Sequence, residues 1–425
     1  MSNLLIQKAT IIDPGNTHDG KVRDILIKKG KIAEIKTRIK DPENIKKLDA
    51  TGAYISPGWI DVGVQTGDPG FEHRETLQTV SQAAAAGGFT AIVCQPNTLP
   101  VIHSKSEVLY LQNRADKNLV EVFPIGAISK ECQGEDLTEM YDMHHSGAVA
   151  FSDGKYPIQN AGLMLRSLQY VKAFNGLIIN HPQEDSISKN AQLHEGVVST
   201  TLGMPGFPSI AEQLMLQRDI DLLAYTDSRL HVSNISTVGG VALLRTAKNR
   251  GLKITGSTPI LNLIFEDNDV ENFDSNLKVL PPLREKSDRE ALLKGLKEGT
   301  LDYITSNHIP LEEEVKMVEF PYAKFGAIGL ETVYPLLNTY LSKKFSISQI
   351  VQMLAINPRK VLQISRPEVK KDHLANLTIF HPTLEWTYSK ENIKSKSRNT
   401  SLLGKTFTGK ILGVVNNNKM EIFLT

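Results

Sequence analysis

The chain has 425 residues and a net charge of +1, with 22% charged and 40% hydrophobic residues. These values are typical of a globular protein and exclude a fibrous repeat or a largely disordered chain. The balanced charge also argues against a nucleic-acid surface as the main function, so no nucleic-acid partner is expected.

The cysteine content and the apolar segments indicate the compartment. Cys94 and Cys132 are the two cysteines, too few for a disulfide framework or a zinc knuckle, and they suit a reducing environment. The start of the chain does not resemble a signal peptide, because Gln7 and Lys8 interrupt a short apolar run. No window approaches the roughly 18 apolar residues of a membrane span. We therefore expect a cytoplasmic protein without a membrane partner.

The two ends of the chain are rich in β-forming residues. Alternating segments run from Leu4 to Ile12 and from Asp24 to Ile35, and a third β-rich region runs from Leu374 to Thr425. Either end alone would leave an unsupported sheet edge. We predict that residues 1–55 and 366–425 join in one composite β-sandwich domain of antiparallel strands. Two separate terminal flaps are the alternative.

Short β-branched runs alternate with segments of helical period through the middle of the chain. Eight such units over about 300 residues suit a (β/α)₈ TIM barrel, in which the loops at one end of the strands carry the function. We predict this α/β barrel for residues 56–365, with a doubly wound sheet as the alternative. The predicted strands are the segment after Pro57, Ala91–Cys94, Val120–Phe123, Ala148–Phe151, Gly176–Ile179, Arg229–Val232, Lys253–Thr255 and Tyr303–Thr305.

The first predicted barrel strand carries the most informative motif. It reads Pro57-Gly58-Trp59-Ile60-Asp61-Val62-Gly63-Val64-Gln65-Thr66-Gly67-Asp68-Pro69-Gly70. This stretch resembles the amidohydrolase superfamily, and most closely the dihydroorotases of the type with a metal-bridging aspartate. Their pattern is Pro-Gly-x-x-Asp-x-His-x-His-x-Arg followed by Pro-Gly. The frame of the motif is present, but its two histidines and its arginine are replaced.

Further segments extend the resemblance over nearly the whole chain. They include Gln95-Pro96-Asn97-Thr98, Phe151-Ser152-Asp153, Lys278-Val279-Leu280-Pro281-Pro282-Leu283-Arg284, Gly326 to Thr332 and Asn357-Pro358. The resemblance implies a protein of pyrimidine biosynthesis whose relatives hydrolyse a cyclic amide with zinc. Fold similarity does not itself establish activity, so each site position must be considered separately.

The resemblance implies six metal-ligand positions, of which two retain a ligating residue. The retained positions are Asp153 and His181, and the substituted ones are Gly63, Gln65, Asn234 and Asn307. Glycine offers no ligand atom, and neutral amides bind zinc poorly compared with imidazole. Asn307 also stands where the family has its general acid and base, and an amide cannot accept the proton of an attacking water. We therefore assign no catalytic residue from the sequence.

The substrate positions implied by the resemblance are also altered. Gly67 replaces an arginine that would clamp a carboxylate, and Leu280 replaces an asparagine before Pro-Pro-Leu-Arg. Asn97 and His308 remain as remnants of the substrate pocket.

These substitutions favour a dihydroorotase homologue that is catalytically inactive and acts as a noncatalytic subunit or scaffold. The resemblance implies aspartate carbamoyltransferase as a candidate partner, and we also expect a homo-oligomer. No cofactor is expected, or at most one weakly bound metal at Asp153 and His181, joined by His308. One alternative is an active cyclic-amide hydrolase of the dihydroorotase, hydantoinase or allantoinase type with a reduced metal site. Another is a small-molecule sensor that uses the old pocket.

Overall fold

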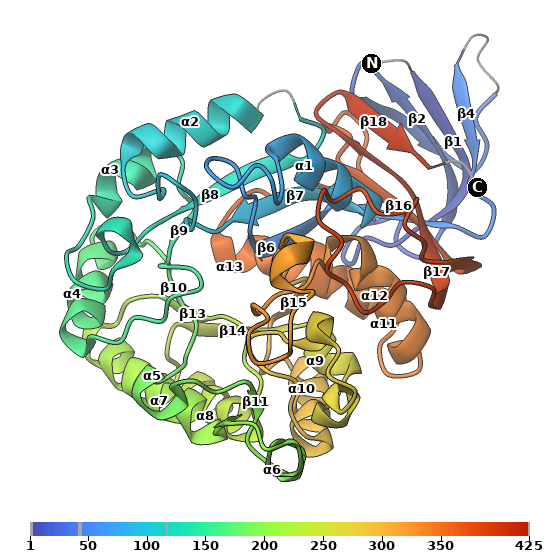
Figure 1. Ribbon diagram of the computed structural model, residues 1–425. Coiled ribbons are helices and arrows are strands. Elements are labelled where there is room, and N and C mark those ends of the chain that lie inside the picture. The colour runs from blue at the N-terminus through green and yellow to red at the C-terminus, as the bar shows by residue number, and fades with distance from the viewer. Residues whose placement is uncertain (1–2, 41–44, 116–117, 424–425) are drawn as a thin grey trace.

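The computed structural model describes residues 3–40, 45–115 and 118–423. Figure 1 shows two parts: a ring of helices and strands, and a sheet in which both ends of the chain lie together. Within the described residues, no helix combines the length and the apolar character needed to span a membrane.

Eight parallel strands form the barrel, and each pairs with the next in chain order. They are β6 (Trp59–Val64), β7 (Phe89–Cys94), β8 (Glu121–Gly126), β9 (Ala150–Phe151), β10 (Ile178–Asn180), β13 (Leu230–Val232), β14 (Ile254–Pro259) and β15 (Tyr303–Thr305). The first and last strands are linked where the Ser306 backbone N–H donates to Asp61 Oδ1 at 2.9 Å. The predicted (β/α)₈ barrel is confirmed, and the doubly wound alternative is not adopted.

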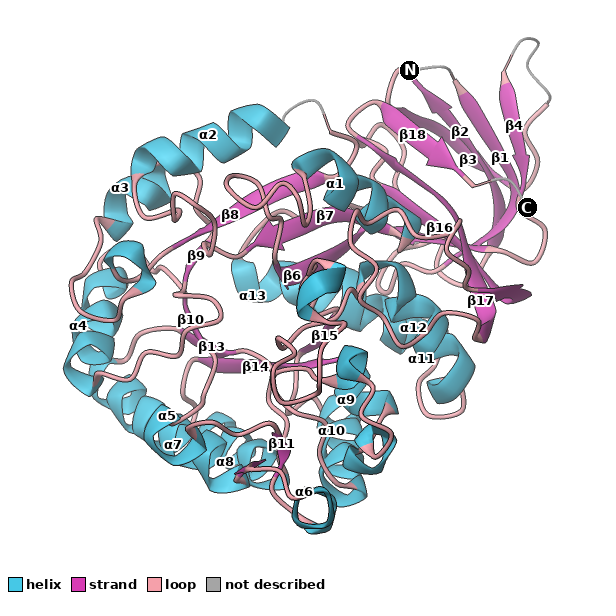
Figure 2. Ribbon diagram, viewed as in Figure 1, coloured by secondary structure: helices cyan, strands magenta, loops and turns pink. Residues whose placement is uncertain are grey.

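Helices surround the barrel strands, while the terminal sheet lies to one side, as Figure 2 shows. The helices are α1 (Leu77–Ala86), α2 (Lys105–Ala115), α3 (Met140–His145), α4 (Ala161–Lys172), α5 (Asp185–Ser188), α6 (Val197–Leu202), α7 (Ser209–Thr226), α8 (Val238–Asn249), α9 (Leu261–Ile264), α10 (Lys286–Glu298), α11 (Val333–Leu341), α12 (Ile347–Val351) and α13 (Asn357–Leu362). Two short strands, β11 (Leu193–His194) and β12 (Gly206–Phe207), pair in the excursion between β10 and α7.

Local signals explain where these helices begin and which face they bury. Thr76 caps α1, because its hydroxyl accepts a hydrogen bond from the Thr79 N–H at 3.1 Å. Leu77, Val80 and Ala84 lie on the buried face of this helix. The apolar face of α1 thus packs on the barrel, and its start fixes the loop that follows β6.

The terminal strands form a single mixed sheet with the order β18-β17-β16-β5-β1-β2-β3, and β4 also pairs with β1. They are β1 (Leu4–Ile11), β2 (Val22–Lys28), β3 (Lys31–Lys36), β4 (Lys46–Asp49), β5 (Tyr54–Pro57), β16 (Leu377–Thr387), β17 (Thr406–Asn416) and β18 (Lys419–Ile422). Antiparallel pairing of β5 with β16 joins the two ends of the chain, as predicted.

The sheet differs from the prediction in two respects. Its strands are hydrogen-bonded into one continuous sheet, whereas a sandwich has two, and β1 pairs in parallel with both β4 and β5. The strands fall within residues 4–57 and 377–422, while the domain limits given above stay predictions.

An aromatic cluster fastens the sheet to the barrel. The Trp59 ring, fully buried at the start of β6, lies 6.2 Å from Phe89, 5.4 Å from Tyr334 and 5.1 Å from Phe380 between ring centroids. These rings come from two barrel strands, α11 and β16. Burial of such large side chains stabilises the junction by several kcal/mol, roughly 2 per side chain.

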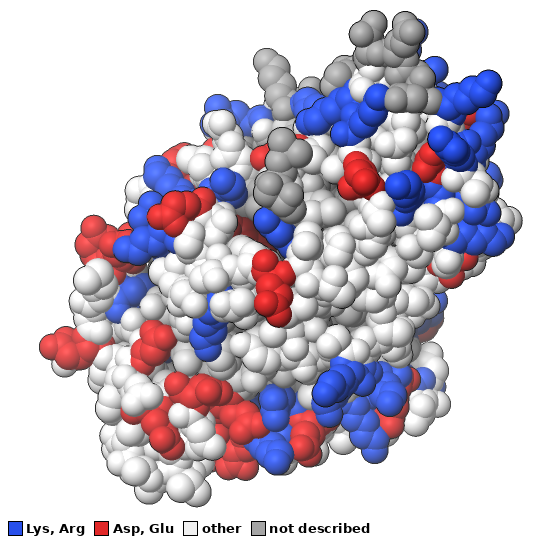
Figure 3. All heavy atoms as spheres, turned by 90° about the vertical axis from the view of Figure 1, so that its right-hand side faces the viewer, with Lys and Arg blue, Asp and Glu red and all other residues white. Residues whose placement is uncertain are grey.

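One face of the molecule shows how its charges are distributed. In Figure 3, Lys and Arg side chains gather at the top of the view with Asp and Glu among them, and neutral residues fill most of the centre. Charges of both signs are therefore interspersed on this face, as the small net charge suggests.

Candidate functional site at the mouth of the barrel

Three of the four positions predicted to be substituted metal ligands have left-handed backbone conformations. The φ angles are +92° at Gly63, +57° at Asn234 and +49° at Asn307. All three lie at or just after the carboxyl ends of barrel strands. Glycine and asparagine adopt this conformation at the lowest cost, whereas most other residues lose about 1–2 kcal/mol. The residues present are therefore those that relieve backbone strain at these strand ends.

Asn234 and Asn307 lie together in a network of neutral hydrogen bonds. Asn234 Nδ2 donates to Asn307 Oδ1 at 3.4 Å, and Asn307 Nδ2 donates to the Leu280 carbonyl at 3.0 Å. The Thr305 hydroxyl donates to Asn234 Oδ1 at 3.1 Å. Both amides thus have partners within the protein, and the predicted general acid and base position holds an amide that bonds its neighbours.

The end of β6 has a similar amide pair. Gln65 Nε2 donates to Gln95 Oε1 at 3.3 Å. A Cβ atom placed on Gly63 would lie 3.4 Å from Gln95 Nε2, so the Gln95 side chain borders the space where a first-strand ligand would project. Gln95 had no assigned role in the sequence, although it precedes Pro96 in one of the matched motifs.

Asp153 caps backbone groups at the end of β8. Its Oδ1 accepts hydrogen bonds from Ile128 N at 2.8 Å and Ser129 N at 2.9 Å, and its Oδ2 accepts one from the Ser129 hydroxyl. Burial raises the pKa of this carboxyl, while these hydrogen bonds act in the opposite direction. Asp153 therefore has a structural role that the prediction of a metal ligand did not include.

Asn97 holds the turn that follows Asp153. Its Nδ2 donates to the Asp153 carbonyl at 3.0 Å, and its Oδ1 accepts from Lys155 N at 3.0 Å. A Cβ atom on Gly154 would lie only 1.9 Å from Asn97 Oδ1. This pocket remnant therefore fills the place where a side chain at residue 154 would project.

His181 is the retained imidazole with an unsatisfied nitrogen. Its Nδ1 lies 3.4 Å from the Ser233 carbonyl, and its buried Nε2 has no hydrogen-bond partner among the described residues. Burial lowers the pKa of His181 to about 4, so the ring is neutral near pH 7. A neutral, unpartnered nitrogen can accept a hydrogen bond or bind a metal.

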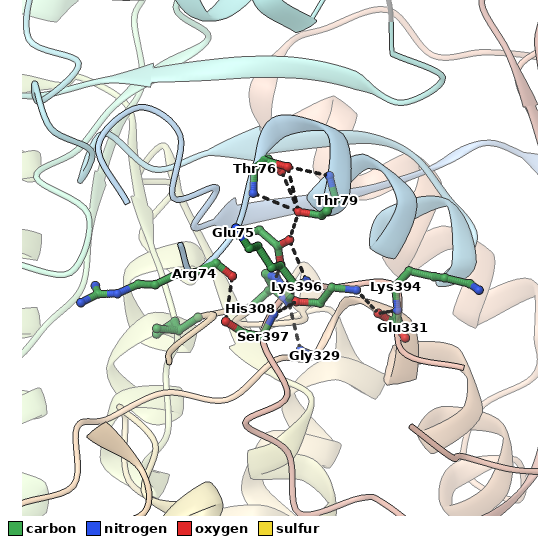
Figure 4. A network of polar contacts seen from close by, with 12 residues as sticks. Arg74, Glu75, Thr76, Thr79, His308, Gly329, Glu331, Lys394, Lys396 and Ser397 are labelled. Carbon is green, nitrogen blue, oxygen red and sulfur yellow. Dashed lines mark hydrogen bonds and ion pairs between the residues drawn. The ribbon is translucent and has the colours of Figure 1, made fainter. Parts of the chain in front are cut away.

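His308 belongs to a buried network between the barrel and the C-terminal segment (Figure 4). Its Nδ1 accepts a hydrogen bond from Gly329 N at 3.2 Å, so in the neutral ring the proton lies on Nε2. That atom lies 3.4 Å from Glu75 Oε2. Glu75 also accepts from Lys396 N at 3.0 Å and from the Ser395 hydroxyl. His308 thus helps to position the chain around the mouth.

The electrostatics of this network favour an ionised Glu75. Burial raises the pKa of the Glu75 carboxyl, but the opposing hydrogen bonds and the neighbouring His308 outweigh it, and the net pKa is lowered. Beside it, Glu331 accepts hydrogen bonds from Lys394 N and Ser395 N, each at 2.9 Å. Figure 4 shows these groups converging on the same segment. Two buried carboxylates therefore attach residues 394–396 to the barrel.

Backbone atoms occupy the place of the expected substrate clamp. Gly67 has a φ of +68°, and a Cβ atom there would lie 2.7 Å from the Glu75 carbonyl oxygen and 2.8 Å from that of Phe71. No side chain fits this conformation without movement of the loop. The carbonyl of Leu280, at the second altered clamp position, accepts the Asn307 amide.

Comparison with known proteins identifies the family. A sequence profile described as Dihydro-orotase-like matches residues 52–239. The dihydroorotase of Syntrophus aciditrophicus (strain SB) is 37% identical over 412 residues, which cover 96% of each chain. That of Thermoanaerobacter sp. (strain X514) is 40% identical over 409 residues, or 96% of this chain and 94% of the relative. The chain belongs to the dihydroorotase family.

The fold is shared more widely. The L-hydantoinase (dihydropyrimidinase) structure from Arthrobacter aurescens aligns with a TM-score of 0.87 at 23% identity, and covers 100% of this chain and 98% of its own. This similarity supports the barrel and its terminal sheet. The predicted site positions at the mouth therefore lie on an intact barrel.

The residues at the mouth do not fit the zinc of the dihydroorotase family. Gly63 has no ligand atom, the amides of Asn234 and Asn307 bond to each other, and Asp153 accepts three hydrogen bonds. Among the described residues, Asp153, His181 and His308 do not form a set of ligand atoms within 4.8 Å of one another. Zinc is usually held by four ligands, and the His181 imidazole alone does not supply them.

One other group of possible ligand atoms lies apart from the predicted set. Atoms of His194, Asp267 and Glu285 lie within 4.8 Å of one another. However, Arg284 Nη1 lies 3.0 Å from His194 Nδ1 and donates to it, so the ring proton is on Nε2, 3.8 Å from Glu285 Oε1. To bind a metal, His194 would have to lose the Nε2 proton, and the metal cation would lie near the positive charge of the buried Arg284 guanidinium. This group therefore fits a polar contact better than a zinc site.

Proposed function

We propose that this member of the dihydroorotase family is a noncatalytic protein of pyrimidine biosynthesis. The main support is the hydrogen bond between Asn234 and Asn307, together with the hydrogen bond that the Asn307 amide donates to the Leu280 carbonyl. Hydrolysis of a cyclic amide needs an activated water and a proton acceptor, and these amides supply neither. A bound metal lowers the pKa of water from 15.7 to about 7, and that activation requires ligands.

Metal analysis and turnover test the proposal together. The purified protein is expected to contain no stoichiometric zinc and to show no hydrolysis of dihydroorotate above background. The same assays with zinc, cobalt or manganese added during purification exclude simple metal loss. Activity that a chelator abolishes, with one or two metals per chain, would instead establish the alternative of a hydrolase with a reduced metal site.

An exposed apolar patch supports the second part of the proposal, a role as a subunit beside a catalytic partner. Met317 and Tyr322 are 80% and 77% exposed, and Val318 and Phe273 are 40% and 45% exposed. The Ser275 hydroxyl donates to the Lys316 carbonyl at 2.6 Å and joins the two segments that carry the patch. Exposed groups of large apolar side chains are typical of protein interaction sites.

The loop that carries most of this patch is firmly anchored. Lys316 Nζ donates to the carbonyls of Lys324 at 2.8 Å and Gly326 at 3.0 Å. Lys278 Nζ donates to the carbonyl of Phe320 at 2.7 Å. An ordered loop loses less conformational entropy on association.

We propose aspartate carbamoyltransferase as the partner, and a homo-oligomer as the state of this chain.

Copurification tests the subunit role. Tagged protein is expected to retain aspartate carbamoyltransferase from its own cell extract, and Met317→Ser with Tyr322→Ser should weaken the association. Tyr225→Ser with Tyr340→Ser is the matched control, because these residues are exposed on other elements. Light scattering of the protein alone reports the oligomer. Equal loss in both variant pairs, or no association at all, would contradict the role assigned to the patch.

A small-molecule sensor is the second candidate, favoured by the unpartnered His181 Nε2. Neutral amides and a neutral imidazole can exchange hydrogen bonds with the N–H and C=O groups of a cyclic-amide ring. Calorimetry with dihydroorotate separates this candidate, because a sensor would bind without turnover and lose affinity in His181→Leu.

A further inference from the structure

A concave site lies at the opposite end of the barrel from the predicted ligand positions. A cavity of about 570 Å³ opens where the amino ends of β10, β13, β14 and β15 meet α8, α10 and the segment from α12 to α13. This volume lies within the usual range of small-ligand sites, roughly 300–1,000 Å³. Figure 1 shows α8 and α10 at the bottom of the molecule.

The cavity has an apolar floor. Buried side chains from strands and helices meet there, namely Leu177, Leu230, Ile254, Leu301, Phe345 and Met353. These side chains are at most 5% exposed, so they offer a packed apolar base for van der Waals contact with an apolar or aromatic body rather than a large surface to remove from water.

The walls are positively charged. Arg229, Lys248, Lys253, Lys297 and Lys360 line the cavity, against Glu298 and Asp302. The lining thus has three more cationic than anionic side chains, whereas the whole chain has a net charge of +1. Such local concentration of one charge favours ligands of the opposite sign.

Only some of these cations are available to a ligand. Lys248 Nζ bonds Asp302 Oδ2 at 2.7 Å and the Gly299 carbonyl at 3.1 Å, and Lys253 Nζ pairs with Asp227 Oδ1 at 2.9 Å. Among the described residues, Lys297 and Lys360 form no ion pair within 4.0 Å, although Lys360 is close enough to Asp302 to oppose the rise that burial causes in the pKa of that carboxyl. Lys248 also covers a carbonyl at the end of α10, which reduces the negative field of that helix end.

The helical segment on one side of the cavity is irregular. Residues Gln352–Ile356 form a π-helical turn, in which Asn357 N donates to the carbonyl of Gln352, five residues earlier. Gln352, Met353 and Asn357 all line the cavity. Single π-helical turns occur frequently at functional sites because they redirect side chains.

We infer that this basal cavity binds a small organic anion, with an apolar or aromatic body on the floor and one phosphate or carboxylate group near Lys297 and Lys360. The inference is independent of the mouth and does not require catalysis. Nucleoside 5′-monophosphates, with an aromatic base and one phosphate, are suitable probes of this chemistry.

Calorimetry with AMP and UMP, compared with adenosine, uridine and inorganic phosphate, tests the ligand class. The monophosphates should bind measurably and more weakly at high salt, while the nucleosides and phosphate alone should bind at least about tenfold more weakly. Equal binding of nucleosides and monophosphates would overturn the assignment of an anion. If neither monophosphate binds, the inference that the cavity holds an anion with an aromatic body is overturned.

Two further measurements locate the binding. Lys297→Glu with Lys360→Glu should weaken binding about tenfold, whereas Lys105→Glu with Lys286→Glu, an equal change of charge at exposed positions elsewhere, should leave it nearly unchanged. In protein with ¹³C-methyl methionine, the ligand should shift the Met353 signal, assigned with Met353→Leu. An equal loss in both variant pairs, or shifts only at other methionines, would place the ligand elsewhere.

Discussion

The mouth of the barrel contains two sets of polar residues with opposite character. The centre, at Gly63, Gln65, Asn234 and Asn307, has no ionisable side chain. Around this centre lie buried carboxylates, here called the frame. Each is either close to a centre residue in the sequence or hydrogen-bonded to a neighbour of one. Asp61 and Glu212 illustrate the frame: the first accepts from Ser306 N at 2.9 Å and the second from Ser236 N at 2.9 Å.

The difference follows from what each carboxylate contacts. A frame carboxylate accepts backbone N–H groups that would otherwise be buried without a partner, so the fold needs it with or without a metal. A carboxylate that faces only a metal is destabilising once the metal is absent, because nothing offsets its desolvation. The centre can therefore change while the frame remains. The predictions below test this comparison, from the largest expected effect to the smallest.

Removal of a frame carboxylate should have the largest effect. Glu212, in the first turn of α7, accepts from the Ser236 and Thr237 backbone N–H groups and from both hydroxyls, the latter at 2.6 Å. Glu212→Ala leaves these donors buried and also removes a charge near Arg284. We expect a loss of about 3–5 kcal/mol in the free energy of unfolding, measured with urea. The exposed Glu290→Ala should change it by less than about 0.5 kcal/mol.

Side chains added at the glycines should separate backbone conformation from crowding. Gly67→Ala meets carbonyl oxygens at 2.7 and 2.8 Å, Gly63→Ala meets only Gln95 Nε2 at 3.4 Å, and Gly203→Ala meets nothing within 4 Å. All three have positive φ angles. Gly203→Ala should cost about 1 kcal/mol, Gly63→Ala a similar amount, and Gly67→Ala at least about 2 kcal/mol in unfolding experiments. Equal costs at all three positions would contradict the crowded loop at Gly67.

The crowding at Gly67 also limits how the arginine expected for the family could be returned to this position. Restoring an arginine at residue 67 requires a different path for the loop, since the Phe71 and Glu75 carbonyls occupy the space beside Gly67. Reversal of the predicted substitutions alone should therefore not restore the clamp unless this loop also moves.

The sequence was sufficient to predict the barrel and the pairing of the chain ends, while the altered site positions stay a prediction. These depend on period, strand propensity and local motifs, which are read directly from neighbouring residues. The partners of Asp153 and His308 were not predictable in this way. Asp153 contacts Ile128 and Ser129, and His308 contacts Glu75, which are 24 or more residues away in the chain. Whether the terminal strands form one continuous sheet or a two-sheet sandwich likewise depends on pairing between strands that are far apart in the sequence.

The pH dependence of stability should depend on His181 at the edge of the centre. Burial lowers its pKa to about 4 in the folded state, against about 6.5 when unfolded. Between these values the unfolded chain binds the extra proton, so this contribution to stability is present above pH 6.5 and is lost as the pH falls toward 4. His181→Leu should reduce the slope of the unfolding free energy by about 1 kcal/mol per pH unit in this range.

Urea titrations at pH 7, 6, 5 and 4.5 would measure this slope. The exposed His145→Leu is the matched control and should leave the slope unchanged. His194 and His231, whose pKa values burial lowers to about 4 and about 3, contribute in the same direction in every variant and cancel in the comparison. An unchanged slope in His181→Leu would mean that this imidazole is solvated or partnered in solution.

A single charge returned to the centre should have the smallest effect and should not recover zinc. In Asn307→Asp, Asn234 Nδ2 still has an acceptor, but a carboxylate oxygen replaces the amide that donates to the Leu280 carbonyl at 3.0 Å. We expect a loss of about 1 kcal/mol, from the broken hydrogen bond and the unpaired charge. Added zinc should leave the melting temperature unchanged, because Gly63 and Gln65 still supply no imidazole and a ligand stabilises only the state that binds it. Asn307→Gly, which removes the same amide without adding charge and tolerates the positive φ of this residue, separates the two costs. A rise of several degrees with zinc in Asn307→Asp alone would show that the centre keeps a metal geometry, and the distinction between centre and frame would then fail.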